Sequence, residues 1–212
     1  MIYKKIVFLC LLISFSFVST AQSVEGKFIL FKLYKSAVFD LGQTQATRTV
    51  SLSNFTPAIA WGEDANFHEI QITSINFQSR AQTFLYSGGA EYSYNHRFTD
   101  QENSRFNFYF GGGFGTSFST SNSSIETSNS VFVPTVGKFI NLNVVAIPRM
   151  TFDLLQNVGL EISLSYNLLD FENSRHTVAD PALPINGQTN VYNELQLFPS
   201  KFSLRVGGIV SF

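Results

Sequence analysis

The chain has 212 residues, of which only 14% are charged, and its formal net charge is −1. A nearly neutral balance gives no electrostatic reason to expect a nucleic-acid partner. Cys occurs only once, which excludes a disulfide framework, whereas Phe occurs 23 times. The length suits a single domain.

Residues 1–21 are expected to form a cleaved signal peptide. Lys4 and Lys5 precede an uncharged apolar run over residues 6–18, and small residues stand at Ser19 and Ala21. A positive start, a short apolar run and small residues before the cut are typical of secretory signals. The run is shorter than the roughly 20 residues of a membrane-spanning helix, so an uncleaved anchor is the less favoured alternative. The single cysteine lies inside this run without the setting of a lipid-attachment site. Cleavage leaves residues 22–212, with 12 basic residues against 15 acidic ones.

Three less regular strands are expected next. The first places Ile29, Phe31, Leu33, Ala37 and Phe39 on one face, although Lys35 shares that face. The second contains Phe55, Pro57, Ile59 and Trp61, and the third covers residues 66–77. Because Pro57 cannot donate to a strand ladder, we expect a bulge in the second strand.

Five regular strands follow, in which apolar residues alternate with small, amide or charged ones. They cover residues 86–94, 106–118, 140–152, 160–168 and 202–212. A period of two is typical of strands that present one apolar face, so the expected total is eight strands.

The expected connections alternate in length along the chain. Short turns are expected at residues 62–65, 98–104 and 154–157. The other connections, at residues 41–48, 78–83, 120–133 and 171–199, include two long ones rich in Ser, Asn, Thr, Pro and Gly.

The last strand, which alternates cleanly and ends on Phe212, resembles the closing strand of bacterial outer-membrane β-barrels. As a whole, residues 22–212 resemble the small eight-stranded members of that family. The resemblance implies an all-β, eight-stranded antiparallel up-and-down transmembrane β-barrel in the cell outer membrane, with short turns on one side and longer loops on the other. It also implies a monomer surrounded by outer-membrane lipid, with Phe212 in the assembly signal read by the barrel-assembly machinery.

A soluble barrel of the lipocalin type would also alternate, so the polar face decides between the two. That face carries small and amide side chains: Gly111, Gly113, Gly115, Asn141, Asn143, Ser163 and Ser165. Such side chains suit the crowded lumen of a narrow barrel better than a water-exposed surface. Trp61, Tyr92 and Tyr94, near expected strand ends, suit the aromatic girdles of a membrane barrel. The pattern therefore favours the membrane barrel.

Eight charged residues are expected to face the lumen: Lys32, Glu69, Glu91, Arg97, Arg149, Glu161, Lys201 and Arg205. We assign six of these to one charge network: Lys32, Glu91, Arg97, Arg149, Glu161 and Arg205. Buried charges must pair or cost several kcal/mol each. Since eight strands leave an interior just wide enough for side chains, salt bridges that plug the barrel are favoured over a gated ion path.

The three histidines, His68, His96 and His176, show no metal spacing and no Ser/His/Asp order. His68 and Glu69 invite comparison with the Ser/His/Glu set of lipid A deacylases, but the flanking motif of that family is missing. The glycine-rich run at residues 111–115 lies in a strand pattern without a following Lys-Ser/Thr, so it is not a phosphate loop. We therefore expect no catalytic residue, no metal and no cofactor.

The sequence thus predicts a non-enzymatic outer-membrane barrel with a filled lumen and outer loops available for adhesion or partner binding. A small-solute porin and a lipid-modifying barrel enzyme are the alternatives. Because the wall should leave no concave site, recognition is expected in residues 171–199 together with residues 120–133. Ragged alternation at Val191, Tyr192, Leu195 and Leu197 suggests a protruding hairpin whose unpaired edge accepts a partner strand, with a mobile solvated loop as the alternative.

Overall fold

A computed structural model describes residues 27–41, 48–52, 55–63, 65–80, 83–99, 105–126, 132–178 and 189–211. The expected signal peptide (1–21) and Phe212 lie outside these described residues. None of the described residues forms a helix that could cross a membrane.

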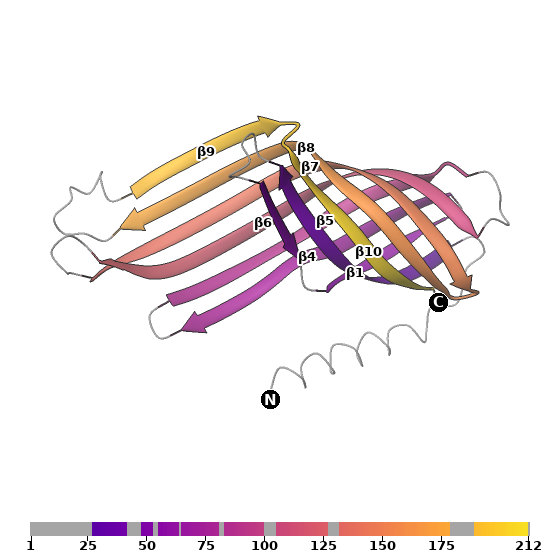
Figure 1. Cartoon of the computed structure of the whole chain (residues 1–212), viewed down its shortest axis with the longest axis horizontal. Helices are drawn as coiled ribbons and strands as arrows, with labels where there is room; N and C mark the ends of the chain where they lie inside the picture. Colours follow the sequence, from indigo (N-terminus) through magenta and orange to yellow (C-terminus); the bar gives the residue numbers. More distant parts are fainter. Residues whose placement is uncertain are drawn as a thin grey trace.

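The described chain is built from β-strands alone (Figure 1). In order they are β1 (Lys27–Leu41), β2 (Arg48–Leu52), β3 (Thr56–Glu63), β4 (Asn66–Arg80), β5 (Thr83–Arg97), β6 (Phe106–Glu126), β7 (Phe132–Leu155), β8 (Val158–Val178), β9 (Thr189–Leu197) and β10 (Lys201–Ser211).

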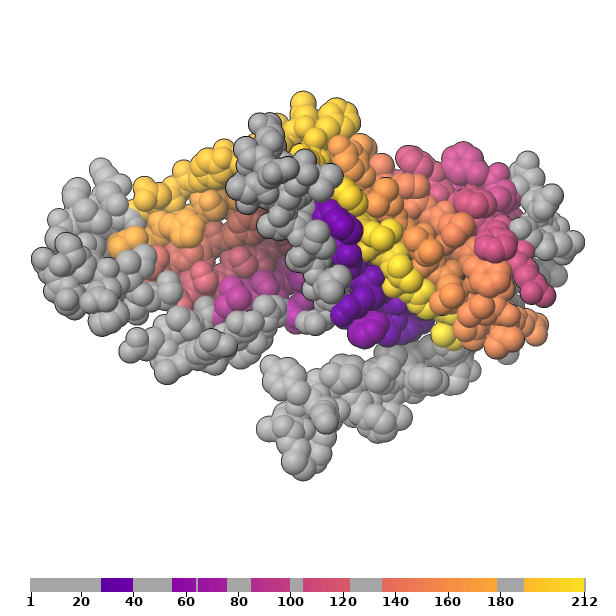
Figure 2. All heavy atoms as spheres, viewed as in Figure 1, coloured from indigo at the N-terminus to yellow at the C-terminus, as the bar shows by residue number. Residues whose placement is uncertain are grey.

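These strands close into an antiparallel barrel. The sheet runs β10-β1-β3-β4-β5-β6-β7-β8, and β10 also pairs with β8, which completes the circle. The seam where β10 lies beside β1 is visible in Figure 2 as yellow next to indigo. Within the described residues the cross-section therefore has eight strands, which confirms the predicted fold class.

Two of the eight strand positions are divided into two pieces. On β1, Tyr34 pairs with Thr56 of β3, but Ala37 pairs with Leu52 of β2, so three steps on β1 face four steps on the other side. This mismatch falls between Leu52 and Thr56, next to Pro57, where a bulge was predicted. The second division separates β9 from β10 at Phe198, whose φ of 50° turns the chain sharply. This second break was not predicted.

The two faces of the wall have opposite chemistry. Apolar side chains point outward: Phe114 is 61% exposed and Leu142 is 47% exposed. Charged side chains point inward: Arg149 is 3% exposed and Glu161 is 0% exposed. A soluble barrel would show the reverse arrangement. Because closed barrels pair all their backbone groups, an outward apolar belt of this kind can face lipid.

The wall is much taller on one side than on the other. Strands β6, β7 and β8 span 21, 24 and 21 residues, whereas β3 and β10 span 8 and 11. The tall strands project toward the left in Figure 1, away from the C-terminus. We call this side the extended end, and we call the opposite side, with the turns after β3, β5 and β7, the turn end.

Much of the two long predicted loops is therefore strand. Residues 120–133 were expected to be a loop, but β6 continues to Glu126 and β7 begins at Phe132. Residues 171–199 were also expected to be a loop, but β8 continues to Val178. It pairs with β9, and the paired residues run from Leu169 opposite Leu197 to Thr177 opposite Thr189. The predicted protruding hairpin is confirmed. Cross-strand pairing between half-exposed strands outweighed the polar composition on which the loop expectation rested.

Candidate functional site

The lumen of the barrel brings together charges from segments that lie far apart in the sequence. Each charge comes from a different strand: Lys32 (β1), Glu69 (β4), Glu91 (β5), Arg149 (β7), Glu161 (β8) and Arg205 (β10). The two remaining strands contribute small inward residues: Ala58 and Ala60 from β3, and Gly111, Gly113 and Gly115 from β6. A Cβ atom at Gly111 or Gly115 would collide with the side-chain oxygen of Asn95 or Asn143, so amide side chains occupy the space beside these two glycines.

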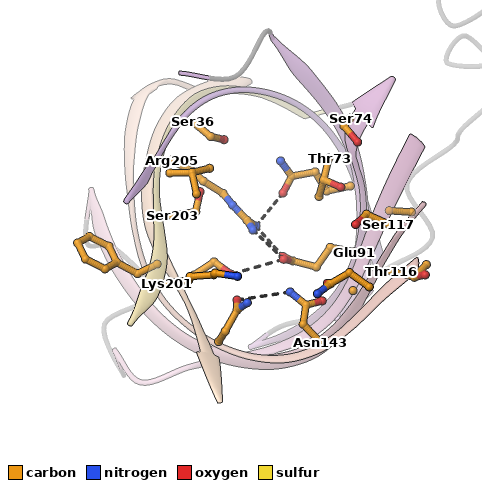
Figure 3. A pocket seen from close by; sticks show the side chains of 18 residues that line it. Ser36, Thr73, Ser74, Glu91, Thr116, Ser117, Asn143, Lys201, Ser203 and Arg205 are labelled. Atoms are coloured by element: carbon orange, nitrogen blue, oxygen red, sulfur yellow. Dashed lines mark hydrogen bonds and ion pairs between the residues drawn. The ribbon is translucent and has the colours of Figure 1, made fainter. Parts of the chain in front are cut away.

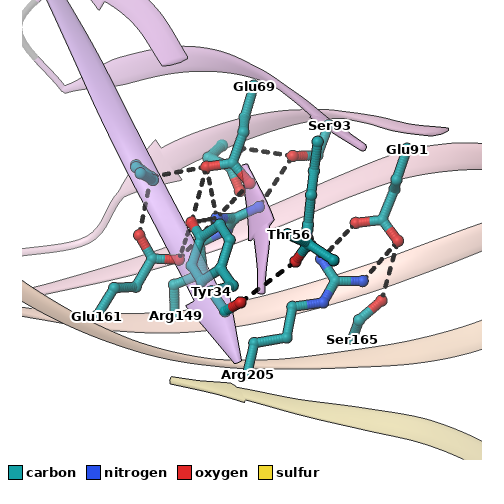
Figure 4. Close-up of polar contacts among 12 residues, drawn as sticks. Tyr34, Thr56, Glu69, Glu91, Ser93, Arg149, Glu161, Ser165 and Arg205 are labelled. Atoms are coloured by element: carbon teal, nitrogen blue, oxygen red, sulfur yellow. Dashed lines mark hydrogen bonds and ion pairs between the residues drawn. The ribbon is translucent and has the colours of Figure 1, made fainter. Parts of the chain in front are cut away.

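Two cations and two carboxylates form a compact first cluster (Figure 4). Lys32 Nζ lies 2.7 Å from Glu69 Oε2 and 2.8 Å from Glu161 Oε2. Arg149 Nη1 lies 2.8 Å from Glu69 Oε1 and 2.7 Å from Glu161 Oε1. Each cation therefore bridges both carboxylates, and the four charges balance. Such mutual pairing is what makes burial of these charges tolerable.

Tyr34 completes this first cluster. Its hydroxyl lies 3.0 Å from Glu69 Oε2 and 2.8 Å from Glu161 Oε1, and Arg149 Nη1 donates to it at 3.1 Å. The ring packs against Gly207 of β10, where a Cβ atom would lie 2.5 Å from the ring carbon Cδ1 of Tyr34. Glycine at that position is therefore needed for the ring to lie where it does.

A second, smaller cluster lies beside the first. The Arg205 guanidinium donates two hydrogen bonds to the Glu91 carboxylate, of 2.6 Å and 2.7 Å, and one of 2.8 Å to Gln71 Oε1. Gln71 donates in turn to Thr56, whose hydroxyl lies 3.5 Å from the backbone carbonyl of Tyr34. Gln71 and Thr56 thus connect the two clusters, and we call the whole arrangement the ion-pair layer.

The remaining predicted lumen charges lie apart from this layer. Arg97 is half-buried near the turn end, and no contact joins it to either cluster within the described part of the chain. Lys201 lies 3.7 Å from Asp170 near the extended end. The single network of six residues predicted from sequence is therefore two linked clusters that contain Glu69 and leave out Arg97.

Cavities lie on both sides of the ion-pair layer. The one toward the extended end has a volume of about 330 Å³, and Figure 3 shows its lining, which includes Thr73, Asn143, Ser203 and Arg205. The one toward the turn end has about 260 Å³. No residue lines both cavities, so the layer separates them. The expectation that the wall leaves no concave site is wrong, because several strands line this cavity with small residues, among them Ser36, Gly115, Ser117, Ser165 and Ser203.

The histidines lie outside the lumen or at its rim. His68 faces outward near the turn end, where its ring stacks on Trp61 and its Nδ1 lies 2.7 Å from the Tyr92 hydroxyl. Glu69, the next residue, points into the lumen, so strand alternation separates the two predicted partners. His96 Nδ1 lies 2.7 Å from Asn66. The described residues contain no cluster of three metal-ligating side chains.

Three members of the layer, Tyr34, Gln71 and Thr56, were not predicted from the sequence. Tyr34 lies two residues after Lys32 on the same strand and therefore shares its inward face, a signal that alternation alone contains. Gln71 follows Glu69 by two residues, and Thr56 lies between the outward residues Phe55 and Pro57, so alternation places both of them inward as well.

No protein-family model matches the chain, and no curated protein matches it in sequence. Among solved structures, the chain is similar to Neisserial surface protein A, with 15% identity and a TM-score of 0.35 over 90% of this chain and 100% of that one. It is similar to Ail, the attachment invasion locus protein of Yersinia pestis, with 11% identity and a TM-score of 0.47 over 89% and 100%. It is also similar to the outer membrane protease OmpT of Escherichia coli, with 8% identity and a TM-score of 0.47 over 92% and 100%. The likeness is one of fold.

Proposed function

We propose that this eight-stranded outer-membrane barrel is a non-enzymatic surface protein that binds an extended segment of a partner protein along β9. The observation that carries the proposal is the unpaired edge of β9. That strand is the last in the sheet order and pairs only with β8 over residues 189–197 within the described chain. Short turns face the periplasm in such barrels, so the extended end with β9 faces outward from the cell.

The chemistry of β9 suits strand addition. An edge strand presents unpaired N–H and C=O groups, and natural proteins usually protect such edges with Lys or Pro. The strand Thr189–Leu197 contains neither residue. Its outward face is apolar at Val191, Leu195 and Leu197, all more than half exposed. A partner strand could therefore gain both backbone hydrogen bonds and apolar contacts.

The closed lumen supports a binding role over transport. The ion-pair layer fills the cross-section between the two cavities with hydrogen-bonded charges, which argues against free passage of solutes. A small-solute porin would require this layer to open, and steady single-channel conductance of the wild-type barrel would favour that alternative.

The enzyme alternative has less support. A lipid-modifying site needs its acid, base and nucleophile on one face, whereas His68 and Glu69 lie on opposite faces of β4. Unchanged lipid A mass spectra in cells with and without the protein would agree with the non-enzymatic proposal, and an altered spectrum would contradict it.

Two neighbouring proline variants, Tyr192→Pro and Asn193→Pro, test the role of the edge. In a strand, the N–H of one residue points to β8 and the N–H of the next points to the free edge. The variant that loses the edge donor should keep the β8–β9 pairing, measured by amide exchange, and lose partner binding. The other variant loses a ladder bond and shows what hairpin disruption alone does.

Binding is measured as retention of cells displaying the full chain on a panel of immobilised surface proteins and on cells of the same strain. We expect reduced retention for the edge-facing variant at equal barrel content in the outer membrane. Equal retention of that variant with its hairpin intact would mean that the binding surface lies elsewhere.

A further inference from the structure

Two basic side chains lie directly opposite each other on the outward face near the extended end. Lys138 of β7 pairs with Arg175 of β8, and both side chains are exposed. Residues that pair directly across two strands share a face, with Cβ atoms about 4.5–5.5 Å apart. Lys138 is an even-numbered β7 residue, like the outward Ile140 and Leu142, so this shared face is the outer one.

Like charges in such a pair repel each other and destabilise the sheet. An acidic neighbour normally relieves this repulsion. Within the described part of the chain, neither Lys138 nor Arg175 has a carboxylate partner. The next strands on either side place Thr120 opposite Lys138 and Val191 opposite Arg175, so the paired neighbours supply no negative charge. The arrangement therefore leaves a place for an anion from outside the chain.

From this pair toward the turn end, the outward residues change in chemical character from one row to the next, and rows nearer the turn end are called lower rows. Two rows below lie Leu142, Phe171 and Leu195, which belong to the apolar belt. One row below lie Ile140 of β7 and the amides Asn173 and Asn193, which are joined by a side-chain hydrogen bond of 2.5 Å. Each row is about 6.7 Å from the next along the strands. Along β8 the outward residues thus change from apolar Phe171 through the amide Asn173 to basic Arg175, in the order in which a bilayer changes from acyl chains to charged headgroups.

We propose that Lys138 and Arg175 bind the phosphate group of a lipid headgroup in the outer leaflet of the membrane. Arg175 can offer two parallel N–H donors to phosphate oxygens, and Lys138 adds a compact charge from the neighbouring strand. The amides of Asn173 and Asn193, one row lower, lie where they can meet the polar linkage between headgroup and acyl chains. The two cations lie on β7 and β8 and act through their side chains, so their role can be tested separately from the backbone edge of β9.

The full-length barrel, reconstituted in nanodiscs, tests this site with three lipids. They are a phosphorylated outer-leaflet glycolipid, the same glycolipid after enzymatic dephosphorylation, and phosphatidylcholine. The readouts are the glycolipid retained per barrel after detergent extraction and the amide shifts of Asn173 and Asn193. Wild type should retain the phosphorylated glycolipid about tenfold better than the dephosphorylated one, and K138Q/R175Q should lose that preference.

Two further variants keep the test interpretable. K138R/R175K preserves both charges and should retain the preference, which separates charge from folding if the glutamine variant assembles poorly. Arg105→Gln removes an exposed cation at the turn end and should leave retention unchanged. Equal retention by wild type and K138Q/R175Q would overturn the proposal. So would inorganic phosphate shifting the same amides in detergent as strongly as the glycolipid does, since the site would then be a general anion site.

Discussion

At the scale of single residues, the lumen combines small inward side chains with paired charges. The glycines at 111 and 115 face inward on β6, where a Cβ atom would collide with the side-chain oxygens of Asn95 and Asn143. Arg149 and Lys32 each contact two carboxylates. The cost of burying these charges is offset because each of them has oppositely charged partners.

Arg149→Ala should destabilise the barrel by roughly 3–5 kcal/mol, because Glu69 and Glu161 would stay buried with Lys32 as their only cation. Loss of the guanidinium also removes part of the layer between the two cavities, so conductance should rise. Urea unfolding in lipid vesicles and planar-bilayer recordings measure the two effects. Arg97→Ala, which lies outside the layer, is the control. An Arg149→Ala barrel with unchanged stability and unchanged conductance would contradict both proposed roles of the layer, which are to stabilise the fold and to block passage of ions through the lumen.

Gly207 and Gly208 form a natural pair for comparison on β10. A Cβ at Gly207 would press on the ring of Tyr34 and on the backbone oxygen of Leu33, whereas a Cβ at Gly208 would have no atom within 4 Å. Gly207→Ala should therefore cost about 1–3 kcal/mol of unfolding free energy through overpacking, and Gly208→Ala should stay within roughly 0.5 kcal/mol of wild type. The same vesicle-based unfolding assay measures both, and equal values would show that the position of Tyr34 does not depend on this glycine.

At the scale of elements, alternation in the sequence was sufficient to locate the strands and to separate their faces. It predicted that Lys32, Glu91, Arg149, Glu161 and Arg205 face inward, and each of them is buried in the structure. Alternation could not predict where two strands break. The division before β10 rests on a positive φ at Phe198, a conformation that the residue type disfavours and that only the surrounding sheet can impose.

The sequence also did not allow the strand ends at the extended end to be predicted. Ser, Asn and Thr at residues 119–124 suit a loop, yet β6 continues through them because β7 pairs with it as far as Phe132. The outer cavity was missed for a related reason. Alternation tells which residues face inward, but the free volume depends on how small residues from several strands coincide at one level.

The closing strand β10 gives a prediction about assembly. It pairs with β1 and β8 at the same time, so its insertion is the step that removes both free edges. Phe212→Asp should reduce the amount of barrel in the outer membrane far more than it weakens barrels that have formed, since one terminal aromatic residue contributes at most about 1.5–3 kcal/mol of burial. Membrane content by immunoblot and unfolding of the purified protein separate the two. Normal insertion of the variant would show that the assembly signal lies elsewhere.

At the scale of the whole molecule, a closed circle of paired strands predicts resistance to detergent. No strand of the circle has a free edge at the level of the ion-pair layer, so unfolding must break many hydrogen bonds together. The protein should fractionate with outer membranes and migrate differently on gels before and after boiling. Recovery as a soluble periplasmic protein with heat-independent migration would contradict the membrane barrel.

The outward apolar belt and the charged lumen also determine where this chain can fold at all. In water, ordinary domains collapse because their apolar residues find one another in the interior. Here the native interior holds Lys32, Glu69, Arg149 and Glu161, and the apolar residues need an acyl-chain environment that the chain itself does not provide. An aqueous compartment therefore offers the exported polypeptide no native state, only aggregation or binding to a chaperone. Folding and membrane insertion are one event, and the stability of the protein belongs jointly to the chain and its bilayer.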